Sequence, residues 1–306
     1  MSDSNPETHD IAARSQASNQ PEEPRWEEIA CALCGAEEKK HLLVDRVRRG
    51  RKRYDFNVVR CERCGFVYVN PRGSGSLFDN EAGGAARLDA AVANEPIYVR
   101  GLAGLREAGL PAEARILDLG CARGDFMAFA KSRGLKVEGV DLNPALAQQA
   151  RDRGFEVVTG DLRALDLEPV YDAVTLWDVI EHVDDPVGVL VACRKVLKHN
   201  GLVFFHTGNA RFQIPKAKVL SLLKPDGGPY LIPFQHLSHF DPDTAASAFA
   251  RAGLEPVSVD FAGTLHYRDA RKRRVMTAVN TLGALLPRVG GPLLTNAMGA
   301  IGRRVD

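Results

Sequence analysis

The chain has 306 residues, 45% of them hydrophobic, which is enough to bury a full core in one large domain plus a small one. Its formal net charge of +1 excludes global electrostatic attraction to nucleic acid or to a membrane surface. The sequence has no run of about 18 consecutive apolar residues and opens on no signal peptide, so we expect a cytoplasmic protein.

Four of the six cysteines form two matched pairs near the N-terminus. Residues 1–25, rich in Ser, Asn, Pro and Glu, are predicted to be a disordered tail. The pairs that follow are Cys31-Ala-Leu-Cys34-Gly and Cys61-Glu-Arg-Cys64-Gly, separated by 26 residues. A two-residue gap lets both thiolates of a pair point at one metal. The pattern predicts a closed, structural Zn²⁺ site in a module spanning 26–72, with redox or disulfide chemistry as the alternative.

A hairpin turning near Gly50 is expected between the two cysteine pairs. Its tip carries Arg46-Val-Arg-Arg-Gly-Arg-Lys-Arg-Tyr54, a basic run that could contact phosphates while aromatic rings stack on bases. RNA is therefore an alternative substrate, although the near-neutral net charge argues against nucleic acid. A Gly- and Ala-rich connector is expected at residues 73–96.

From residue 97 onward, strand-like and helix-like segments alternate. After a helix near Tyr98, strands are predicted at residues 115–120, 136–141, 155–160, 171–177 and 201–207. This alternation favours an α/β fold with a doubly wound parallel sheet. The long insertion at 209–240, which carries four prolines, is predicted to be a substrate lid.

The first strand leads into a turn of small residues, Gly120-Cys-Ala-Arg-Gly124, that lets the backbone approach a ligand closely. The next two strands end in acids, Asp141 and Asp161. Because the carboxyl ends of parallel strands meet at one edge of a sheet, the turn and both acids should line one crevice. We expect Asp141 to accept the hydroxyls of a ribose and Asp161 to face an adenine edge.

Four motifs together resemble the class I S-adenosylmethionine-dependent methyltransferases over residues 97–306. They are Leu117-Asp-Leu-Gly-Cys-Ala-Arg-Gly124, Gly139-Val-Asp-Leu-Asn-Pro144, Gly160-Asp-Leu162 and Tyr171-Asp-Ala-Val-Thr-Leu-Trp-Asp-Val-Ile-Glu-His-Val183. The resemblance implies S-adenosyl-L-methionine as cofactor and a Rossmann-like sheet of seven strands. The sixth strand is expected at 255–261 and an antiparallel seventh at 293–302.

The resemblance also implies roles for individual residues. Asp118 and Gly120 would shape the methionine end, Asp161 and Leu162 the adenine end, and Trp177 the floor after the fourth strand. The full set of expected cofactor-binding residues is Asp118, Gly120, Cys121, Gly124, Asp141, Leu142, Asp161, Leu162, Trp177 and Tyr98.

The cysteine region has a resemblance of its own. The second pair continues as Cys64-Gly-Phe-Val-Tyr-Val-Asn-Pro-Arg72, which is similar to the N-terminal module of bacterial small-molecule methyltransferases. This implies a small-molecule substrate in a sugar, polysaccharide or secondary-metabolite pathway. O-methylation is the first expectation. The alternatives are C-methylation of a nucleotide-linked sugar, RNA methylation, or a non-catalytic cofactor-binding partner protein.

Transfer of a sulfonium methyl requires alignment, and a base if the acceptor must lose a proton. Histidine suits that role near neutral pH. The candidates are His182, just after the fourth strand, and His236 and His239, at the end of the insertion. Further along, residues 271–289 join a basic cluster to an amphipathic stretch, which predicts a peripheral membrane contact.

Overall fold

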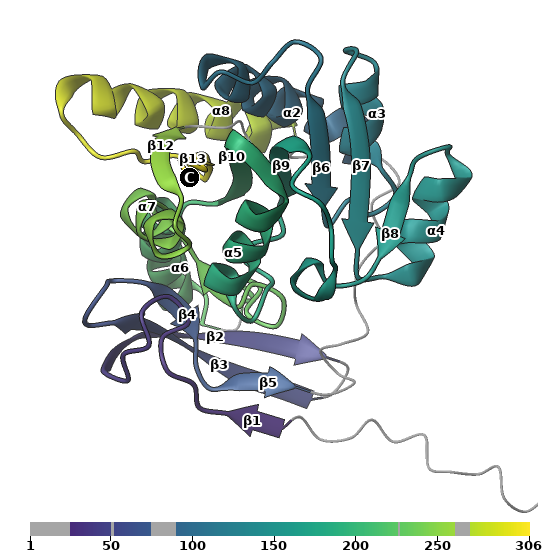
Figure 1. Ribbon diagram of the computed structural model, residues 1–306. Helices are drawn as coiled ribbons and strands as arrows, with labels where there is room; N and C mark the ends of the chain where they lie inside the picture. The colour runs from purple at the N-terminus through teal and green to yellow at the C-terminus, as the bar shows by residue number, and fades with distance from the viewer. Residues whose placement is uncertain (1–24, 50–51, 75–89, 226, 261–269) are drawn as a thin grey trace, which may run out of the picture.

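The computed structural model describes residues 25–49, 52–74, 90–225, 227–260 and 270–306, in two packed layers (Figure 1). The expected tail, the turn near Gly50 and most of the connector lie outside these residues, although Arg25 begins the first strand. The larger layer is a seven-stranded sheet flanked by helices, and a smaller sheet built around the cysteine pairs lies against it.

The seven strands follow the order β12-β13-β10-β9-β6-β7-β8. All neighbouring pairs among β6 to β10 are parallel, whereas β13 is antiparallel to both β10 and β12. This arrangement confirms the predicted doubly wound sheet with an antiparallel last strand. The bounds are β6 Arg115–Leu119, β7 Lys136–Asp141, β8 Val157–Thr159, β9 Tyr171–Trp177, β10 Leu197–Gly208, β12 Glu255–Asp260 and β13 Ala297–Arg303.

Alternating side chains on the buried strands enter two separate cores, because successive residues of a strand point to opposite faces. Phe204 packs in the core beneath α2 and α3, while Phe205 packs in the core beneath α5 and α7. The helices of this layer are α2 Ala90–Glu107, α3 Asp125–Lys131, α4 Pro144–Asp152, α5 Pro186–Val196, α7 Pro242–Arg251 and α8 Ala270–Leu285, with short 3-10 turns η1 Leu162–Ala164 and η2 Leu286–Val289.

The smaller layer, which we call the cysteine module, comprises β1 to β5. A two-stranded sheet pairs β1 with β5, and a four-stranded sheet has the order β11-β4-β3-β2. The bounds are β1 Arg25–Glu27, β2 Lys39–Arg49, β3 Lys52–Cys61, β4 Val67–Val69, β5 Arg72–Ser74 and β11 Ser238–His239. Strand β11 comes from the far end of the insertion, so the second sheet joins two distant parts of the chain.

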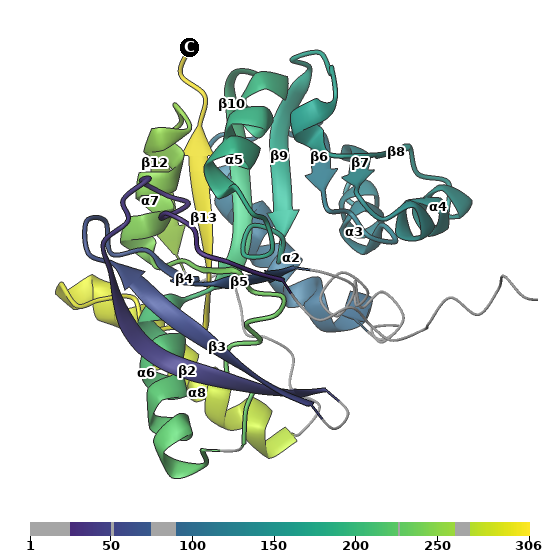
Figure 2. The same cartoon turned by 90° about the horizontal axis from the view of Figure 1, so that it is seen from below.

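The insertion at 209–240 begins as helix α6, Ala210–Leu223, capped by the Asn209 side chain. Ile214 and Ala217 of α6 pack against Leu43 and Val58 of the hairpin β2–β3, and Figure 2 shows the helix alongside that hairpin. The buried Asp45 carboxylate then accepts backbone N–H groups of residues 230 and 231 at 2.7–3.0 Å. Helix α6, residues 227–237, which we call the strap, and β11 therefore all contact the cysteine module.

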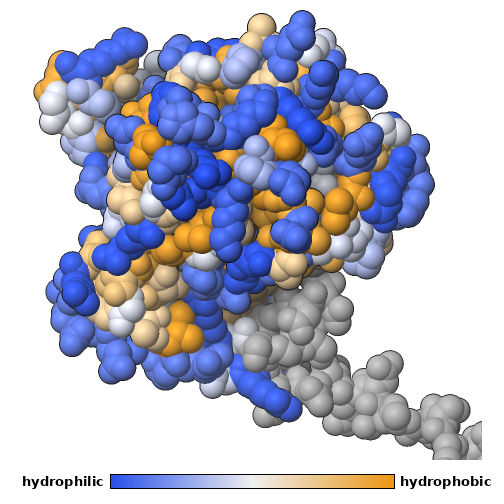
Figure 3. All heavy atoms as spheres, viewed as in Figure 1, coloured by the Kyte–Doolittle hydropathy of each residue, from blue (hydrophilic) through white to orange (hydrophobic). Residues whose placement is uncertain are grey.

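Hydrophilic residues cover most of the face seen in Figure 1, and hydrophobic ones gather near its middle, above the cysteine module (Figure 3). Among the described residues, no helix combines the length and apolar composition needed to cross a bilayer.

Candidate active site and four-cysteine cluster

The turn at residues 120–124, which we call the cofactor turn after the role predicted for it, depends on glycine. Gly120 and Gly124 have φ values of 72° and 82°, a region that side-chain-bearing residues rarely adopt. A Cβ atom at Gly120 would lie 2.5 Å from a methyl carbon of Val179, in the loop after β9. The cofactor turn is thus in direct contact with the segment that follows the fourth strand of the sheet.

The side chain of Asp141 ties this turn to the end of β7. One carboxylate oxygen accepts the backbone N–H of Ala122 at 2.7 Å, and the other accepts that of Asn143 at 2.8 Å. The backbone N–H of Gly160 donates to the Asp141 carbonyl at 3.0 Å, which brings the end of β8 alongside. The three strand ends predicted to share one crevice are therefore adjacent.

Asp118 lies inside the sheet at 2% exposure, and its carboxyl accepts the Thr175 hydroxyl at 2.9 Å. Burial raises the pKa of this carboxyl to about 8. The carboxyl is therefore neutral near pH 7, inside the strand that leads into the cofactor turn.

Replacing Asp118 with Asn is expected to make stability less dependent on pH. Because the carboxyl has a pKa of about 8 when folded and about 3.9 in an unfolded chain, the folded protein binds more protons between these values. Its stability therefore falls as pH rises through that window, by at most about 1.4 kcal/mol per unit. Thermal unfolding followed from about pH 5 to pH 8 should show the steeper loss in the wild type; parallel curves would contradict a neutral buried carboxyl.

The remaining expected cofactor residues occupy varied surroundings. Cys121 and Leu162 are buried, Leu142 is 68% exposed, and Asp161 caps η1 while pairing with Arg163 at 2.7 Å. The Arg163 side chain lowers the pKa of Asp161. Trp177 and Tyr98 pack edge to face at 4.9 Å in the core beneath α2 and α3. Their contact with a cofactor stays a prediction.

Two of the three candidate histidines meet at the loop after β9. The imidazole rings of His182 and His236 lie 4.8 Å apart, nearly perpendicular, and Nδ1 of His182 is 3.0 Å from the carbonyl oxygen of Gln235. The buried Glu181 completes what we call the histidine cluster, because one ligand-type atom of each of these three residues lies within 4.8 Å of the others. The fold thus joins the fourth strand to the end of the insertion.

His239 occupies a different environment. It belongs to β11, pairs with Val67 of β4, and is only 4% exposed. Burial lowers the pKa of His239 to about 4, so its imidazole is neutral near pH 7. Its ring centroid lies 6.4 Å from that of His236.

Sequence reasoning did not single out Glu181 as a site residue. The signal was present, because Glu181 directly precedes His182 in the motif after the fourth strand. Its burial could not be read from the sequence, since carboxylates are almost never fully buried unless they are paired.

The four predicted metal ligands converge in the cysteine module. The sulfurs of Cys31 and Cys64 lie 3.6 Å apart and those of Cys34 and Cys61 lie 3.5 Å apart. A tetrahedral zinc ion with Zn–S bonds of about 2.3 Å places neighbouring sulfurs about 3.8 Å apart, so the arrangement fits one such ion. Backbone N–H groups of Leu33 and Cys34 point at the Cys31 sulfur, as expected around a thiolate.

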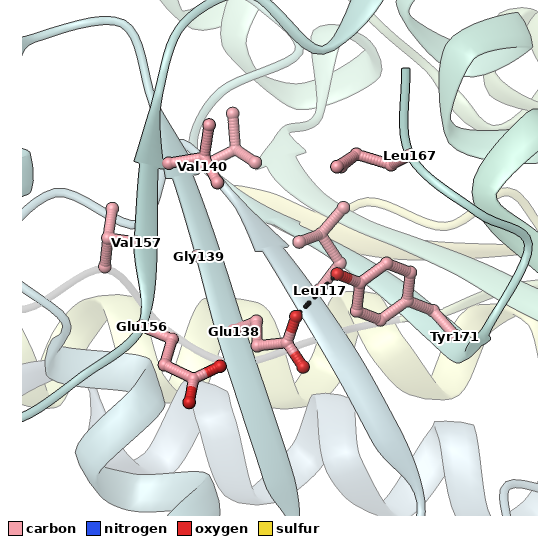
Figure 4. Close-up of a pocket in the computed structure, with 9 residues that line it drawn as sticks. Leu117, Glu138, Gly139, Val140, Glu156, Val157, Leu167 and Tyr171 are labelled. Atoms are coloured by element: carbon pink, nitrogen blue, oxygen red, sulfur yellow. Dashed lines mark hydrogen bonds between the residues drawn. The ribbon is translucent and has the colours of Figure 1, made fainter. Parts of the chain in front are cut away.

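A separate pocket opens between β7, β8 and the start of β9 (Figure 4). Glu138 turns toward Tyr171, and its carboxylate accepts a hydrogen bond from the Tyr171 hydroxyl at 2.8 Å. None of the residues expected to bind the cofactor, and no member of the histidine cluster, lines this pocket.

Residues 96–259 match a family model described as a methyltransferase domain, a stretch that makes up more than half of the chain. The chain belongs to this methyltransferase family. The match covers the cofactor turn, both acidic strand ends and the histidine cluster, and it leaves the cysteine module outside. The resemblance inferred from the four motifs is confirmed.

Two curated relatives of this methyltransferase are named ubiquinone biosynthesis O-methyltransferase. The protein from Bordetella pertussis is 32% identical over 163 residues, covering 50% of this chain and 66% of the relative. The protein from Xanthomonas axonopodis pv. citri is 32% identical over 185 residues, covering 56% and 75%. A solved structure of a putative sarcosine dimethylglycine methyltransferase from Galdieria sulphuraria gives a TM-score of 0.48 at 17% identity, covering 68% of this chain and 85% of that one.

Proposed function

We propose that this protein transfers the methyl group of S-adenosyl-L-methionine to an oxygen atom of a small molecule. The observation that carries the proposal is the contact between the cofactor turn and the loop after β9, through Gly120 and Val179. That loop leads within two residues to the histidine cluster, where an acceptor's proton can be received. The names of the curated relatives favour oxygen as the acceptor atom.

S-adenosylmethionine supplies a methyl group on a positively charged sulfur, which is already a good leaving group. The cofactor turn and Asp141 would hold it, and the Asp141 carboxylate, which already accepts the N–H groups of Ala122 and Asn143, would also accept hydrogen bonds from the ribose hydroxyls. The histidine cluster promotes loss of the acceptor's hydroxyl proton. The acceptor oxygen then bonds to the methyl carbon as the carbon–sulfur bond breaks, with both electrons going to sulfur.

Asp141→Ala is expected to weaken cofactor binding by about 2 to 3 kcal/mol, because charge-assisted hydrogen bonds to the ribose are lost. Calorimetric titration with S-adenosylhomocysteine measures the change. Asp152→Ala is a matched control, since this exposed carboxylate lies at the end of α4 and accepts a hydrogen bond from Gln148 at 2.8 Å. If Asp141→Ala binds S-adenosylhomocysteine with unchanged affinity, Asp141 is not part of the cofactor site.

The proposed reaction is tested by incubating the purified protein with S-adenosylmethionine and a panel of acceptors. The panel contains catechols, phenols, sugars and nucleotide-linked sugars, each with a counterpart whose hydroxyls are blocked as methyl ethers. We expect S-adenosylhomocysteine to form only with free hydroxyls. Transfer to a blocked acceptor would favour C-methylation, and cofactor binding without turnover on any acceptor would favour a non-catalytic partner protein.

RNA is disfavoured as the substrate by the charges around the hairpin. Arg46 and Arg53 both approach the carboxylate of Asp55, at 3.7 and 3.4 Å, which offsets part of the positive charge of this run. Fewer cations then remain to displace counterions from a phosphate backbone.

Helix α8 supports a peripheral membrane contact as part of the proposal. Its side chains Val275 and Leu282 are 55% and 66% exposed, and Arg271 and Arg274 are exposed near its start. Apolar and basic groups on one surface helix favour binding to anionic lipid. We expect the protein to sediment with vesicles containing phosphatidylglycerol, and we expect Leu282→Asp to weaken this binding several-fold. Equal sedimentation of the wild type and the variant would show that α8 does not contact the membrane.

A further inference from the structure

The end of strand β10 carries a buried histidine that the proposed reaction does not use. His206 is 1% exposed, and its Nδ1 atom lies 2.7 Å from a carboxylate oxygen of Asp178. Because a carboxylate accepts hydrogen bonds, the proton of the neutral imidazole sits on Nδ1, and Nε2 keeps its lone pair. The Nε2 atom is buried and has no hydrogen-bond partner in the part of the chain that the structure describes.

Trp177 offers the complementary group on the neighbouring strand. It is the registered partner of His206 in the parallel pair β9–β10, so both side chains lie on one face of the sheet, and their ring centroids are 6.4 Å apart. The indole Nε1–H is likewise buried, without a hydrogen-bond partner among the described residues. Buried polar atoms in folded proteins are nearly always hydrogen-bonded, because an unpaired one lowers stability. A buried donor next to a buried acceptor therefore indicates a site for a polar ligand group.

A hydroxyl group satisfies both nitrogens. Its oxygen can accept the indole N–H, and its hydrogen can be donated to the lone pair of the imidazole. An ether oxygen lacks the hydrogen and an ammonium group lacks the lone pair, so neither satisfies both. We propose that Trp177 and His206 bind a hydroxyl group of the methyl acceptor and thereby select among acceptors. This role rests on the proposed function, because it requires a methyl acceptor.

Both rings are held in place before a ligand binds. Trp177 packs against Phe204 and Phe126, with ring centroids 4.6 and 4.7 Å apart. The carboxylate of Asp178 orients the imidazole, and its backbone N–H donates to the carbonyl oxygen of His206 at 3.1 Å. Asp178 has a φ of 54°, which is strained for a residue with a side chain, and such residues cluster at functional sites. Groups fixed in this way discriminate well between ligands.

The location suits contact with an acceptor. The residue that follows Asp178 is Val179, whose side chain touches the cofactor turn at Gly120. Trp177 and Asp178 are both partly exposed, so this strand end meets solvent. An acceptor held by Trp177 and His206 would thus lie beside the turn at which the cofactor is expected.

The chain has two tryptophans, Trp26 and Trp177, which give a direct readout of binding. Their indole N–H signals are recorded on ¹⁵N-labelled protein saturated with S-adenosylhomocysteine, and Trp26→Phe assigns them. Phenol and cyclohexanol are titrated in, each compared with its methyl ether. We expect at least one of the two alcohols to shift the Trp177 signal saturably, and both ethers to leave it unchanged. Equal shifts with an alcohol and its ether, or no shift with any probe, would overturn the site.

Two substitutions of His206 separate ligand binding from a structural role. Asparagine places its amide near Nδ1 and can still donate to Asp178, but it has no atom at Nε2. Glutamine places its amide near Nε2 and gives up the bond to Asp178. We expect His206→Asn to weaken binding of the alcohol by about five- to tenfold, the effect of losing one hydrogen bond, and His206→Gln to weaken it less. A histidine with only a structural role would give the opposite order.

Trp177→Phe removes the indole N–H but keeps an aromatic ring in the core, so it should weaken binding of the alcohol to a similar extent. Binding to this variant is followed through the signals of the probe itself. His199→Ala is the matched control, because His199 is exposed at the start of β10, and it should bind the probe like the wild type. Thermal unfolding of each variant shows whether it is folded. Wild-type affinity in both His206→Asn and Trp177→Phe would overturn the site.

Failure of the proposed function is distinguishable from failure of this site. If no acceptor is methylated, the titrations still decide whether Trp177 and His206 bind a hydroxyl group. Where an acceptor is methylated, we expect His206→Asn to raise KM more than it lowers kcat. If the alcohols bind as expected but KM is the same in the wild type and in His206→Asn, the role of these residues in selecting the acceptor is overturned.

Discussion

His236→Ala is expected to lower turnover by about 10²- to 10⁴-fold while leaving cofactor affinity nearly unchanged, the range typical of losing assistance to proton transfer. His236 stands 4.8 Å from the His182 ring and contributes to the histidine cluster, whereas the cofactor turn and Asp141 belong to other strand ends. Turnover under saturating cofactor, with calorimetry of S-adenosylhomocysteine binding in parallel, measures the two effects separately.

His239→Ala is the informative comparison for this variant. Because His239 is buried and held neutral, its loss should affect turnover less than the loss of His236. His199→Ala should retain full activity. If His236→Ala and His239→Ala both keep wild-type turnover over a range of pH and His182→Ala alone abolishes it, the insertion only positions the substrate and proton loss depends on the loop after β9.

Cys34→Ser is expected to unfold the cysteine module and to reduce turnover to near background, while cofactor binding persists. Structural zinc contributes roughly 10 to 16 kcal/mol to the folding of small domains, which matches or exceeds the total stability of most domains. Without the module, β11 loses its partner β4, and the strap that carries His236 loses its anchor. The cofactor turn makes its contacts elsewhere, with β7 and the loop after β9.

Elemental analysis, circular dichroism and cofactor calorimetry on the same samples test this second expectation. Cys193→Ala is the matched control, since this buried cysteine lies on α5 outside the four-cysteine cluster. Wild-type turnover in Cys34→Ser would show that the module does not support the histidine cluster. Loss of cofactor binding together with turnover would show that the two layers fold as one unit.

Much of the main sheet could be predicted because its central strands, β6, β9 and β10, are buried on both faces. Runs such as Leu202 to Phe205 are continuously apolar, and the interruption of each run by small or acidic residues marks the strand end. The antiparallel last strand was predicted only from the resemblance. Its sequence is rich in Gly and Ala, which carry little strand preference of their own.

The contacts of the insertion could not be predicted. Strand β11 has only two residues, and what makes it a strand is its pairing with β4, far away in the sequence. The buried carboxylate of Asp45 likewise has partners only across the fold, at residues 230 and 231. Local patterning carries no information about such contacts, because the partner is chosen by tertiary packing.

The candidate site likewise has a part that could be predicted from the sequence and a part that could not. The cysteine cluster follows from spacing, since two CxxC pairs can meet at one metal in few other ways. The histidines were predicted as alternatives for a single role. Their actual arrangement, with Glu181 and His182 meeting His236 and with His239 buried in β11, depends on how the insertion lies along the module.

The insertion contributes strand β11 to the sheet of the cysteine module, and this has a consequence for protein engineering. Cutting the chain after residue 74 would leave β4, with the sequence Val67-Tyr68-Val69, as the outer strand of its sheet with its backbone groups exposed. Open strand edges of this kind recruit other chains and promote aggregation. The cysteine module should therefore not be transferable to another enzyme as an independent tag, unless the graft also carries a segment equivalent to residues 237–239 to close that edge.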